Sequence, residues 1–400
     1  DMNINLMRDK RILHIGQAPK ELGGSLTTGV SNVIRELFNN KIEGYEMILY
    51  ATNISNEIAE NISTHRITGY SKNLFNDYLL PIISSPIKTI RELFLYFKIG
   101  VNPLRYLFYR LNISRCIKSF NPDIIHNHGI SQFLPTFFAS NNIPILLTFH
   151  GFFYKKQNNP IYDRLVEYSM PFVKNVTVLT EEMSKELQTS FPKQYDILNL
   201  IPNGIDTSKF YYSFDARKQI QIELNLNEDD IIFITVASIQ ERKGQLSFIK
   251  YIQKSGLENY KYIIIGKGPQ EIEIIDYIKV HNLENNVLLI GYVENAELYK
   301  YYSVSDVYAH CSLSEGQSLS EIEAYATDLK VIVNKSITGT VSGNIDDISR
   351  YCVIDINNET NYHNFLEFCS LKKTNRKSKQ SFSWEIILKS YCEVYDMILF

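Results

Sequence analysis

The chain has 400 residues, 44% of them hydrophobic, and a formal net charge of −3. The length suits two domains of about 200 residues each, and the slightly negative charge excludes a protein that holds nucleic acid mainly through a basic surface. Five scattered cysteines without a Cys-x-x-Cys pair exclude a disulfide framework, and the absence of a long apolar run predicts a cytoplasmic chain that spans no membrane.

Short β-branched or aliphatic runs alternate with longer amphipathic runs, which is the pattern of βαβ units on a parallel sheet. A turn signal at 201–206, Ile-Pro-Asn-Gly-Ile-Asp, divides these runs into two sets. We therefore predict two doubly wound Rossmann-like domains, 1–200 and 201–380, facing a central cleft, and an amphipathic helix in 381–400. The predicted strands are 11–15, 47–50, 123–126, 145–149, 176–179, 231–236, 262–265, 287–290, 307–310 and 331–333.

Two glycines, Gly23 and Gly24, follow the first predicted strand. Without side chains, they would let the backbone approach a ligand closely, and a simple turn is the alternative. Three histidines follow later strands: His126, His128 and His150. The His-x-His spacing is compatible with a metal, but no third ligand stands at a suitable spacing in the sequence, so we predict no metal site there.

The stretch 86–120 is basic and aromatic. It carries seven cations against one acid, Glu92, a local charge of +6. Cations and aromatics on amphipathic helices suit an anionic membrane surface, at which each cation contributes about 1 kcal/mol. The alternative is a helical pair that turns its cations to water and packs its apolar side chains into the domain. Those side chains are Leu93, Phe94, Phe97, Leu107 and Phe108.

The predicted second domain opens with a strand, a loop and two adjacent cations, Arg242 and Lys243. Fixed cations stabilise the negative charge that develops on a leaving diphosphate. A solvated basic helix start is the alternative, although cations at a helix N-terminus oppose the macrodipole. Further on, the pattern at 266–268, Gly-Lys-Gly, lacks the third glycine of a dinucleotide fingerprint, because Glu271 occupies that position; we predict a tight structural turn.

Two carboxylates, Glu315 and Glu323, stand eight positions apart across a predicted strand-to-helix junction. Such a junction offers free backbone N–H groups and a helix dipole to an anion. Two helical turns of separation let both carboxylates face one cavity. The carboxylates can accept hydrogen bonds from hydroxyl groups, and the backbone N–H groups between them can donate hydrogen bonds to phosphate. This combination indicates a sugar nucleotide as the ligand. A surface loop before a solvated helix is the alternative.

Glu-x7-Glu followed by Ala resembles the signature of the retaining glycosyltransferases of family 4, which have the GT-B fold. The resemblance implies that Glu315 contacts hydroxyls of the transferred sugar and that Glu323 binds the ribose hydroxyls. The intervening loop would hold phosphate through its backbone, although it reads Gly-Gln-Ser-Leu-Ser where the family usually has Gly-Phe-Gly-Leu-Pro. The loop residues expected to bind the donor are Gln317, Ser318, Leu319 and Ser320.

Other segments resemble the same family. The run 148–151, Thr-Phe-His-Gly, is similar to the family's Thr-x-His-Gly, which implies that His150 lies beside the donor sugar. The Gly23–Gly24 pair resembles a loop near the donor phosphate and sugar, and Tyr292 and Val293 resemble a segment whose backbone binds the nucleobase. Lys243 resembles the family's phosphate-binding lysine, and Arg242 is expected to substitute for the arginine of the family's usual Gly-Arg, which is absent after 231–236.

The resemblance implies a retaining hexosyl- or N-acetylhexosaminyltransferase that needs no metal or cofactor, with His150, Glu315 and Lys243 as catalytic residues. It would move a sugar from a nucleotide diphosphate, most often UDP, to a hydroxyl acceptor during assembly of bacterial surface polysaccharide or glycoconjugate. Donor would bind the second domain and acceptor the first, with the last helix crossing back to the first domain. The enzyme would work in the cytoplasm, with peripheral membrane contact through 86–120. A sugar-nucleotide epimerase and a catalytically silent GT-B partner are the alternatives.

Overall fold

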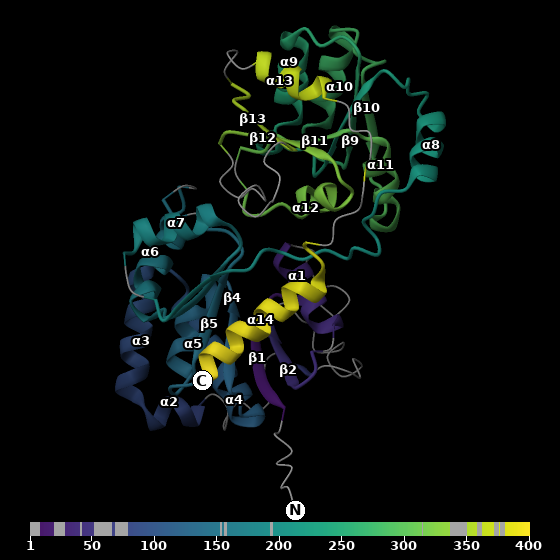
Figure 1. The fold of residues 1–400 in the computed structure, drawn as a ribbon. Coiled ribbons are helices and arrows are strands. Elements are labelled where there is room, and N and C mark those ends of the chain that lie inside the picture. Colours follow the sequence, from purple (N-terminus) through teal and green to yellow (C-terminus); the bar gives the residue numbers. More distant parts are fainter. Residues whose placement is uncertain are drawn as a thin grey trace, which may run out of the picture. The chain divides into compact units, whose positions relative to one another are not determined.

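The structure is a computed structural model that describes residues 9–19, 29–40, 42–51, 66–68, 79–152, 154–155, 158–192, 195–313, 315–336, 350–357, 362–371, 376 and 381–400. The described residues form two compact units (Figure 1). The first unit contains those of Asp1–Leu179, Met183–Ile201 and Leu388–Phe400. The second contains Thr180–Glu182 and those of Pro202–Ile387.

The first unit is built on a parallel sheet of seven strands in the order β3-β2-β1-β4-β5-β6-β7. The order changes direction between β1 and β4, which lie next to each other although 107 residues separate them in the chain. The strands are β1 Lys10–Gly16, β2 Tyr45–Ala51, β3 Arg66–Thr68, β4 Ile124–His128, β5 Ile145–Phe149, β6 Asn175–Val178 and β7 Ile197–Leu200. The helices are α1 Gly29–Asn39, α2 Leu80–Ser84, α3 Pro86–Ile99, α4 Pro103–Phe120, α5 Phe133–Ala139, α6 Pro160–Ser169 and α7 Glu181–Ser190.

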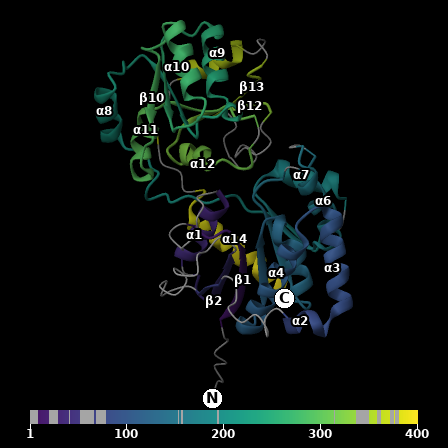
Figure 2. The same cartoon turned by 180° about the vertical axis from the view of Figure 1, so that it is seen from behind.

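Successive residues of β1 face opposite sides of this sheet. Leu13 and Ile15 join a core with α4, to which Ile113 and Phe120 contribute. The other face carries His14 and is covered in part by α14, Trp384–Leu399, which runs across it in both views (Figures 1 and 2). The sequence accounts for the sharp boundaries of α4: the Asn102 side chain accepts a hydrogen bond from the first turn, and Asn121 ends the helix in the left-handed conformation.

The second unit is built on a parallel sheet of six strands in the order β10-β9-β8-β11-β12-β13, which changes direction between β8 and β11. Its strands are almost continuous apolar runs, as expected for a sheet covered on both faces. They are β8 Ile231–Val236, β9 Tyr260–Ile265, β10 Val287–Gly291, β11 Val307–His310, β12 Lys330–Asn334 and β13 Tyr351–Ile354. The helices are α8 Phe214–Glu223, α9 Gln245–Ser255, α10 Glu271–Val280, α11 Leu298–Val304, α12 Leu319–Ala326 and α13 Tyr362–Ser370.

The last helix, α14, packs on the first unit, as predicted. His126 Nδ1 lies 2.8 Å from the Tyr395 hydroxyl, and Tyr45 donates to Asp396 at 2.6 Å. The start of α14 makes contacts within the second unit, because the Trp384 ring lies where a side chain on Gly204 would stand, with 2.6 Å to an ideal Cβ. A glycine is therefore required at 204 for the indole to pack.

All ten predicted strands are present, so the prediction of two doubly wound parallel sheets is confirmed. Three strands were not predicted: β3, β7 and β13, each of which lies at an edge of its sheet. β3 has only three residues, and Asn199 interrupts the apolar run of β7. β13 is an apolar run of four residues, Tyr-Cys-Val-Ile, that the sequence-based prediction missed.

One interpretation of 86–120 is wrong in part. Phe94 and Phe97, which that interpretation packed into the domain, are 70% and 73% exposed, and Phe108 is 42% exposed. Leu107 is buried and Leu93 packs partly against it. The buried face of α3 instead consists of Thr89, Glu92, Tyr96 and Ile99.

Candidate active site

The sequence-predicted residues of the second unit gather at one edge of its sheet. Parallel strands all end at the same edge, and ligands of such sheets bind where the strand order changes direction. That point lies between β8 and β11. Lys243 follows β8, and Glu315 follows β11. The topology thus brings together two side chains that are 72 residues apart.

Gly244 allows these two loops to touch. Its φ is +72°, and an ideal Cβ would lie 2.1 Å from the carbonyl oxygen of Cys311. The Leu313 N–H donates to the Arg242 carbonyl oxygen at 2.7 Å, which joins the loops a second time. The left-handed conformation and the close approach both require glycine at this position. The backbone therefore fixes where Lys243 stands.

Glu315 is the centre of a charged cluster. The Lys243 ammonium donates a hydrogen bond to Glu315 Oε1, Ser312 Oγ donates to the same oxygen at 3.1 Å, and the Arg242 guanidinium lies 3.5 Å from it. The Glu315 side chain is 14% exposed. Burial favours a raised pKa for this carboxyl, but the Lys243 charge and hydrogen bond outweigh it, so the pKa is lowered. Glu315 is therefore ionised at neutral pH, and an incoming phosphate would compete for the lysine.

The start of α12 offers backbone N–H groups. Ser318 is the N-cap residue but makes no side-chain cap hydrogen bond. Its hydroxyl instead bonds with Tyr308. The Gln317 side chain accepts a buried hydrogen bond from the Asn203 N–H at 2.6 Å, and this bond fixes the position of the loop before α12. The first-turn N–H groups of Leu319 and Ser320 thus lack a side-chain cap and can bind an anion.

Glu323 lies in the second turn of α12 and is 8% exposed. Tyr302 of α11 donates a hydrogen bond to its Oε2 at 2.8 Å. Burial raises the pKa of Glu323 to about 7, and the Tyr302 bond lowers it by less. Its expected contact with ribose hydroxyls stays a prediction.

One buried hydrogen-bonded pair was not predicted. His310, the last residue of β11, places its Nδ1 2.9 Å from Oε2 of Glu321 in α12, and the two residues are 3% and 0% exposed. Glu321 lies between Glu315 and Glu323 in the sequence. No local sequence pattern at this position predicts that its side chain is buried. A histidine eleven positions upstream, at a strand end, was the available hint.

The turn after β9 has a structural role, as predicted. Ideal Cβ atoms on Gly266 and Gly268 would lie 2.0 Å and 2.1 Å from the carbonyl oxygens of Ala237 and Ile239. Both glycines are therefore needed for the turn to pack on the loop that follows β8. Nearby, Tyr292 is 66% exposed after β10, whereas Val293 packs against the core.

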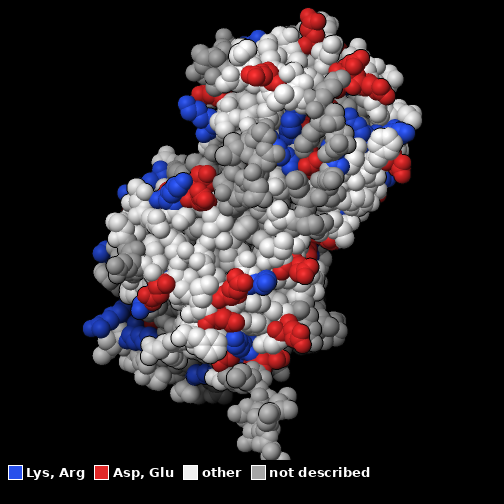
Figure 3. Space-filling model, viewed as in Figure 1, with Lys and Arg blue, Asp and Glu red and all other residues white. Residues whose placement is uncertain are grey.

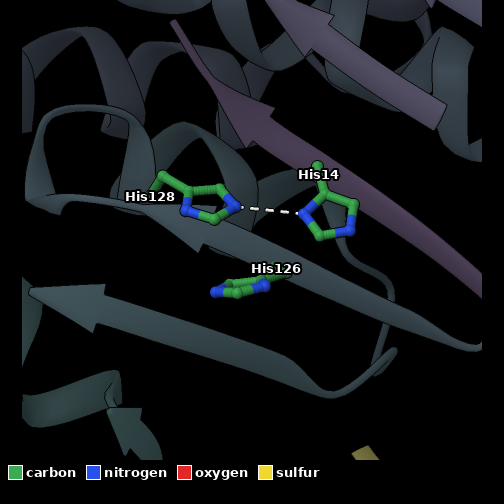
Figure 4. Close-up of side chains that lie close together, drawn as sticks. All are labelled: His14, His126 and His128. Atoms are coloured by element: carbon green, nitrogen blue, oxygen red, sulfur yellow. Dashed lines mark hydrogen bonds between the residues drawn. The ribbon is translucent and has the colours of Figure 1, made fainter. Parts of the chain in front are cut away.

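In the first unit, His150 follows β5 and belongs to a cluster of four histidines with His14, His126 and His128. The inference that no third possible metal ligand is near His126 and His128 is wrong, because β1 brings His14 beside them from 114 positions before His128 (Figure 4). Gly23 and Gly24 lie outside the described residues.

The cluster is held by hydrogen bonds. His14 pairs with His128 at 3.0 Å, and His126 bonds with Thr148 at 2.7 Å and with Tyr395 at 2.8 Å. The His126 and His128 rings are stacked, with centroids 4.1 Å apart. A metal ion lies in the plane of each imidazole that binds it, so stacked rings with engaged nitrogens favour a hydrogen-bonded cluster over metal ligation.

A cavity of about 770 Å³ lies elsewhere in the first unit. Ile145, Asn175 and Ile197 line it, and these residues begin β5, β6 and β7. It is therefore at the edge of the sheet opposite to His150, and it is not part of the candidate site.

Two family models match the chain: Glycosyltransferase Family 4 over residues 27–209 and Glycosyl transferases group 1 over residues 216–380. The alpha-monoglucosyldiacylglycerol synthase of Acholeplasma laidlawii is 33% identical over 141 residues, which are 34% of this chain and 35% of that protein. An uncharacterized glycosyltransferase of Methanocaldococcus jannaschii is 25% identical over 252 residues, 59% of this chain and 61% of that protein. The chain thus matches no more than 61% of the length of these two relatives.

Among solved structures, Anabaena HepE in complex with UDP resembles this chain with a TM-score of 0.72 at 12% identity, over 97% of this chain and 99% of that one. At this identity the likeness concerns the fold alone, and it confirms the predicted GT-B fold. The two family matches, which together cover almost all of residues 27–380, show that the chain belongs to glycosyltransferase family 4.

Proposed function

We propose that the protein is a retaining glycosyltransferase that moves a hexosyl or N-acetylhexosaminyl group from a UDP-linked sugar to a hydroxyl acceptor. The observation that carries the proposal is the hydrogen-bonded pair of Lys243 and Glu315. The pair lies where the strand order of the second sheet changes direction, and Glu315 is four residues before the start of α12. Cations and free N–H groups fit a diphosphate, and the carboxylate fits sugar hydroxyls. The UDP bound by Anabaena HepE supports the choice of nucleotide.

In this proposal Lys243, Arg242 and the start of α12 hold the diphosphate. The bond from the anomeric carbon to the diphosphate oxygen breaks, and a bond from the same face of that carbon to the acceptor oxygen forms. The acceptor proton passes to the departing diphosphate, whose growing charge the two cations stabilise. Glu315 and His150 orient the sugar, and Glu323 binds the ribose. Because the chain supplies the cations, we propose that no metal is needed and that chelation leaves activity intact.

The test is calorimetric binding of UDP to the full chain with Lys243→Ala and a matched control, Lys279→Ala, from the exposed end of α10. Loss of a charge-assisted hydrogen bond costs about 1.5–3 kcal/mol, so Lys243→Ala is expected to weaken UDP binding about 10- to 150-fold. The control binds as the wild type does. Failure of the wild type to bind UDP or any other nucleoside diphosphate would reject the proposal and favour a catalytically silent GT-B partner. Epimerisation of the donor without transfer would favour the epimerase.

We place the acceptor at a membrane, on the cytoplasmic side, because of an exposed apolar face on α2 and α3. Ile83, Ile87, Ile90, Phe94 and Phe97 recur every three or four positions, and each is at least 65% exposed. Large apolar side chains that are exposed together at helical spacing mark an interaction site. Among the described residues, no helix is long and apolar enough to cross a membrane.

The charge around this apolar face fits an anionic lipid surface. Lys88, Arg91 and Lys98 of α3 are exposed, and Lys and Arg gather over α3 at the lower left of Figure 3. The acid between positions 79 and 108, Glu92, is buried 2.6 Å from Arg110, so it does not repel phosphate. An in-plane amphipathic surface would bring the enzyme to a lipid-carried acceptor for glycolipid or surface-polysaccharide assembly. The name of the Acholeplasma relative, a glucosyldiacylglycerol synthase, supports this choice.

The membrane proposal predicts that Phe94→Ser with Phe97→Ser lowers co-sedimentation with phosphatidylglycerol vesicles at least tenfold, since each buried aromatic contributes about 1.5–3 kcal/mol. The matched control is Ile272→Ser with Val280→Ser, which removes two equally exposed apolar side chains from α10. Equal losses in both variants, or no binding by the wild type, would reject the proposal. A lipid-free dimer that only the α3 variant abolishes would instead identify a second copy of the chain as the partner.

A further inference from the structure

Three imidazoles of the first unit, two of them fully or nearly fully buried, form one continuous series of hydrogen bonds. His14 Nδ1 lies 3.0 Å from His128 Nε2, and His128 Nδ1 lies 3.1 Å from His150 Nε2. These residues come from β1, β4 and the end of β5, which are adjacent in the sheet. Figure 4 shows the bond between His14 and His128, with His126 below it. This series of hydrogen bonds therefore connects His14, inside the sheet, to His150 at the carboxyl edge of the sheet.

The protons of the three rings are coupled. Burial lowers the pKa of His14 to about 3 and of His150 to about 4, and that of His128 well below its usual value, so all three are neutral at pH 7. A neutral imidazole has one N–H and one bare nitrogen. Because both nitrogens of His128 bond to other imidazoles, one donates and the other accepts. Either all three rings carry the proton on Nδ1, or all three carry it on Nε2.

The two ends of this series of hydrogen bonds differ. His14 is fully buried within β1, and its Nε2 has no hydrogen-bond partner among the described residues. A proton on that nitrogen would bury an N–H without an acceptor, which folded proteins avoid. His150 Nδ1 is likewise a buried atom without a partner among the described residues, but the His150 side chain as a whole keeps some exposure and lies at the edge where ligands bind such sheets. The pattern with all protons on Nδ1 puts the free N–H at that edge.

We propose that His14 and His128 are positioning residues that hold the proton of His150 on Nδ1, so that His150 donates a hydrogen bond to an oxygen of the transferred sugar. The identity of that ligand rests on the proposed function. His126 takes no part in the proton coupling, because Thr148 and Tyr395 engage its two nitrogens. Its ring packs against His128 with centroids 4.1 Å apart and keeps that ring in plane with its partners.

The test uses an isosteric pair at the buried end, His14→Asn and His14→Asp. Either side chain reaches the place of Nδ1, but Asn can donate to His128 Nε2 whereas an Asp carboxylate can only accept. Imidazole ¹⁵N shifts of the ligand-free full chain then report the proton on His150, two rings away. We expect it on Nδ1 in the wild type and in His14→Asn, and on Nε2 in His14→Asp. An unchanged His150 in His14→Asp, or a bare Nδ1 in the wild type, would overturn the proposal.

If the His14→Asp variant does not fold, measurements on the wild type alone still show which nitrogen of each ring carries the proton. Nitrogen–nitrogen couplings across the His14–His128 and His128–His150 hydrogen bonds are expected with Nδ1 as the donor, and their absence would refute the series of hydrogen bonds. With active enzyme, His14→Asp should lower kcat about tenfold relative to His14→Asn at equal UDP affinity, the effect of one lost neutral hydrogen bond. A wild type without transferase activity would reject the proposed function while leaving the ¹⁵N result valid.

Discussion

The two sheets share one topology and carry different chemistry where their strand order changes direction. Between β1 and β4 of the first unit lie neutral, buried imidazoles, and two of them, His14 and His126, stand inside strands. Between β8 and β11 of the second unit lie charged side chains, Lys243 and Glu315, on the loops that follow the strands. The first arrangement suits neutral hydroxyl groups, and the second suits a charged diphosphate.

This contrast shows that the fold determines where a binding site lies in each unit, whereas the local sequence determines which chemical groups the site contains. Side chains inside a strand are fixed by the sheet and can be kept dry, which preserves neutral hydrogen-bond networks. Side chains on loops can approach a ligand, but their positions depend on turn geometry. We therefore expect the site of the second unit to be sensitive to backbone changes and that of the first unit to be sensitive to proton positions.

The largest expected effect comes from Gly244→Ala. The new Cβ would stand 2.1 Å from the Cys311 carbonyl oxygen, so the loop must move and carry Lys243 away from Glu315. We expect UDP binding to weaken by more than about 100-fold and stability to fall by about 2–4 kcal/mol, measured by calorimetry and urea unfolding.

Gly256→Ala is the matched control for this clash. Gly256 has nearly the same φ, +76°, at the end of α9, but nothing lies within 4 Å of an ideal Cβ. It should lose only the stability due to backbone strain, about 1 kcal/mol, and should bind UDP normally. Equal effects on binding at the two positions would show that the contact with Cys311 does not set the site.

The second prediction is that the stabilities of the two units depend on pH in opposite directions. The pKa of Glu323 is raised from 4.5 to about 7, so its contribution to stability is complete below pH 4.5 and declines as the pH rises, by about 3 kcal/mol. The pKa of His14 is lowered from 6.5 to about 3, so its contribution is complete above pH 6.5 and falls by about 2 kcal/mol between pH 6.5 and 5.

Hydrogen exchange resolved by peptide measures each unit separately, which a single melting temperature does not. Between pH 7 and 5, after correction for the intrinsic exchange rate, β1 and β4 should lose protection while α12 gains it. Glu323→Gln should abolish the change in α12 and leave β1 unaffected. A loss of protection in both units would contradict the assignment of a raised pKa to Glu323.

The sequence predicted the fold better than the site. Most central strands are rich in β-branched and aliphatic residues, whereas β7 is an edge strand whose apolar run is interrupted by Asn199. Lys243 and Glu315 belong to local patterns and were found. His14 was not, because it stands in an apolar strand, and its meaning depends on the pairing of β1 with β4, which no local pattern encodes. The pairing of His310 with Glu321 likewise exists only in three dimensions.

The smallest expected effect separates the two adjacent cations of the second unit. The Arg242 side chain is 54% exposed and lies 3.5 Å from Glu315, whereas Lys243 is 15% exposed and hydrogen-bonds to it. Solvent and salt screen exposed charges, so Arg242→Ala should weaken UDP binding only about threefold, and less at high ionic strength. Calorimetry at two salt concentrations, beside Lys243→Ala, measures this. A larger loss for Arg242→Ala than for Lys243→Ala would make the arginine the main phosphate ligand, and the buried lysine would then serve chiefly to hold Glu315 ionised.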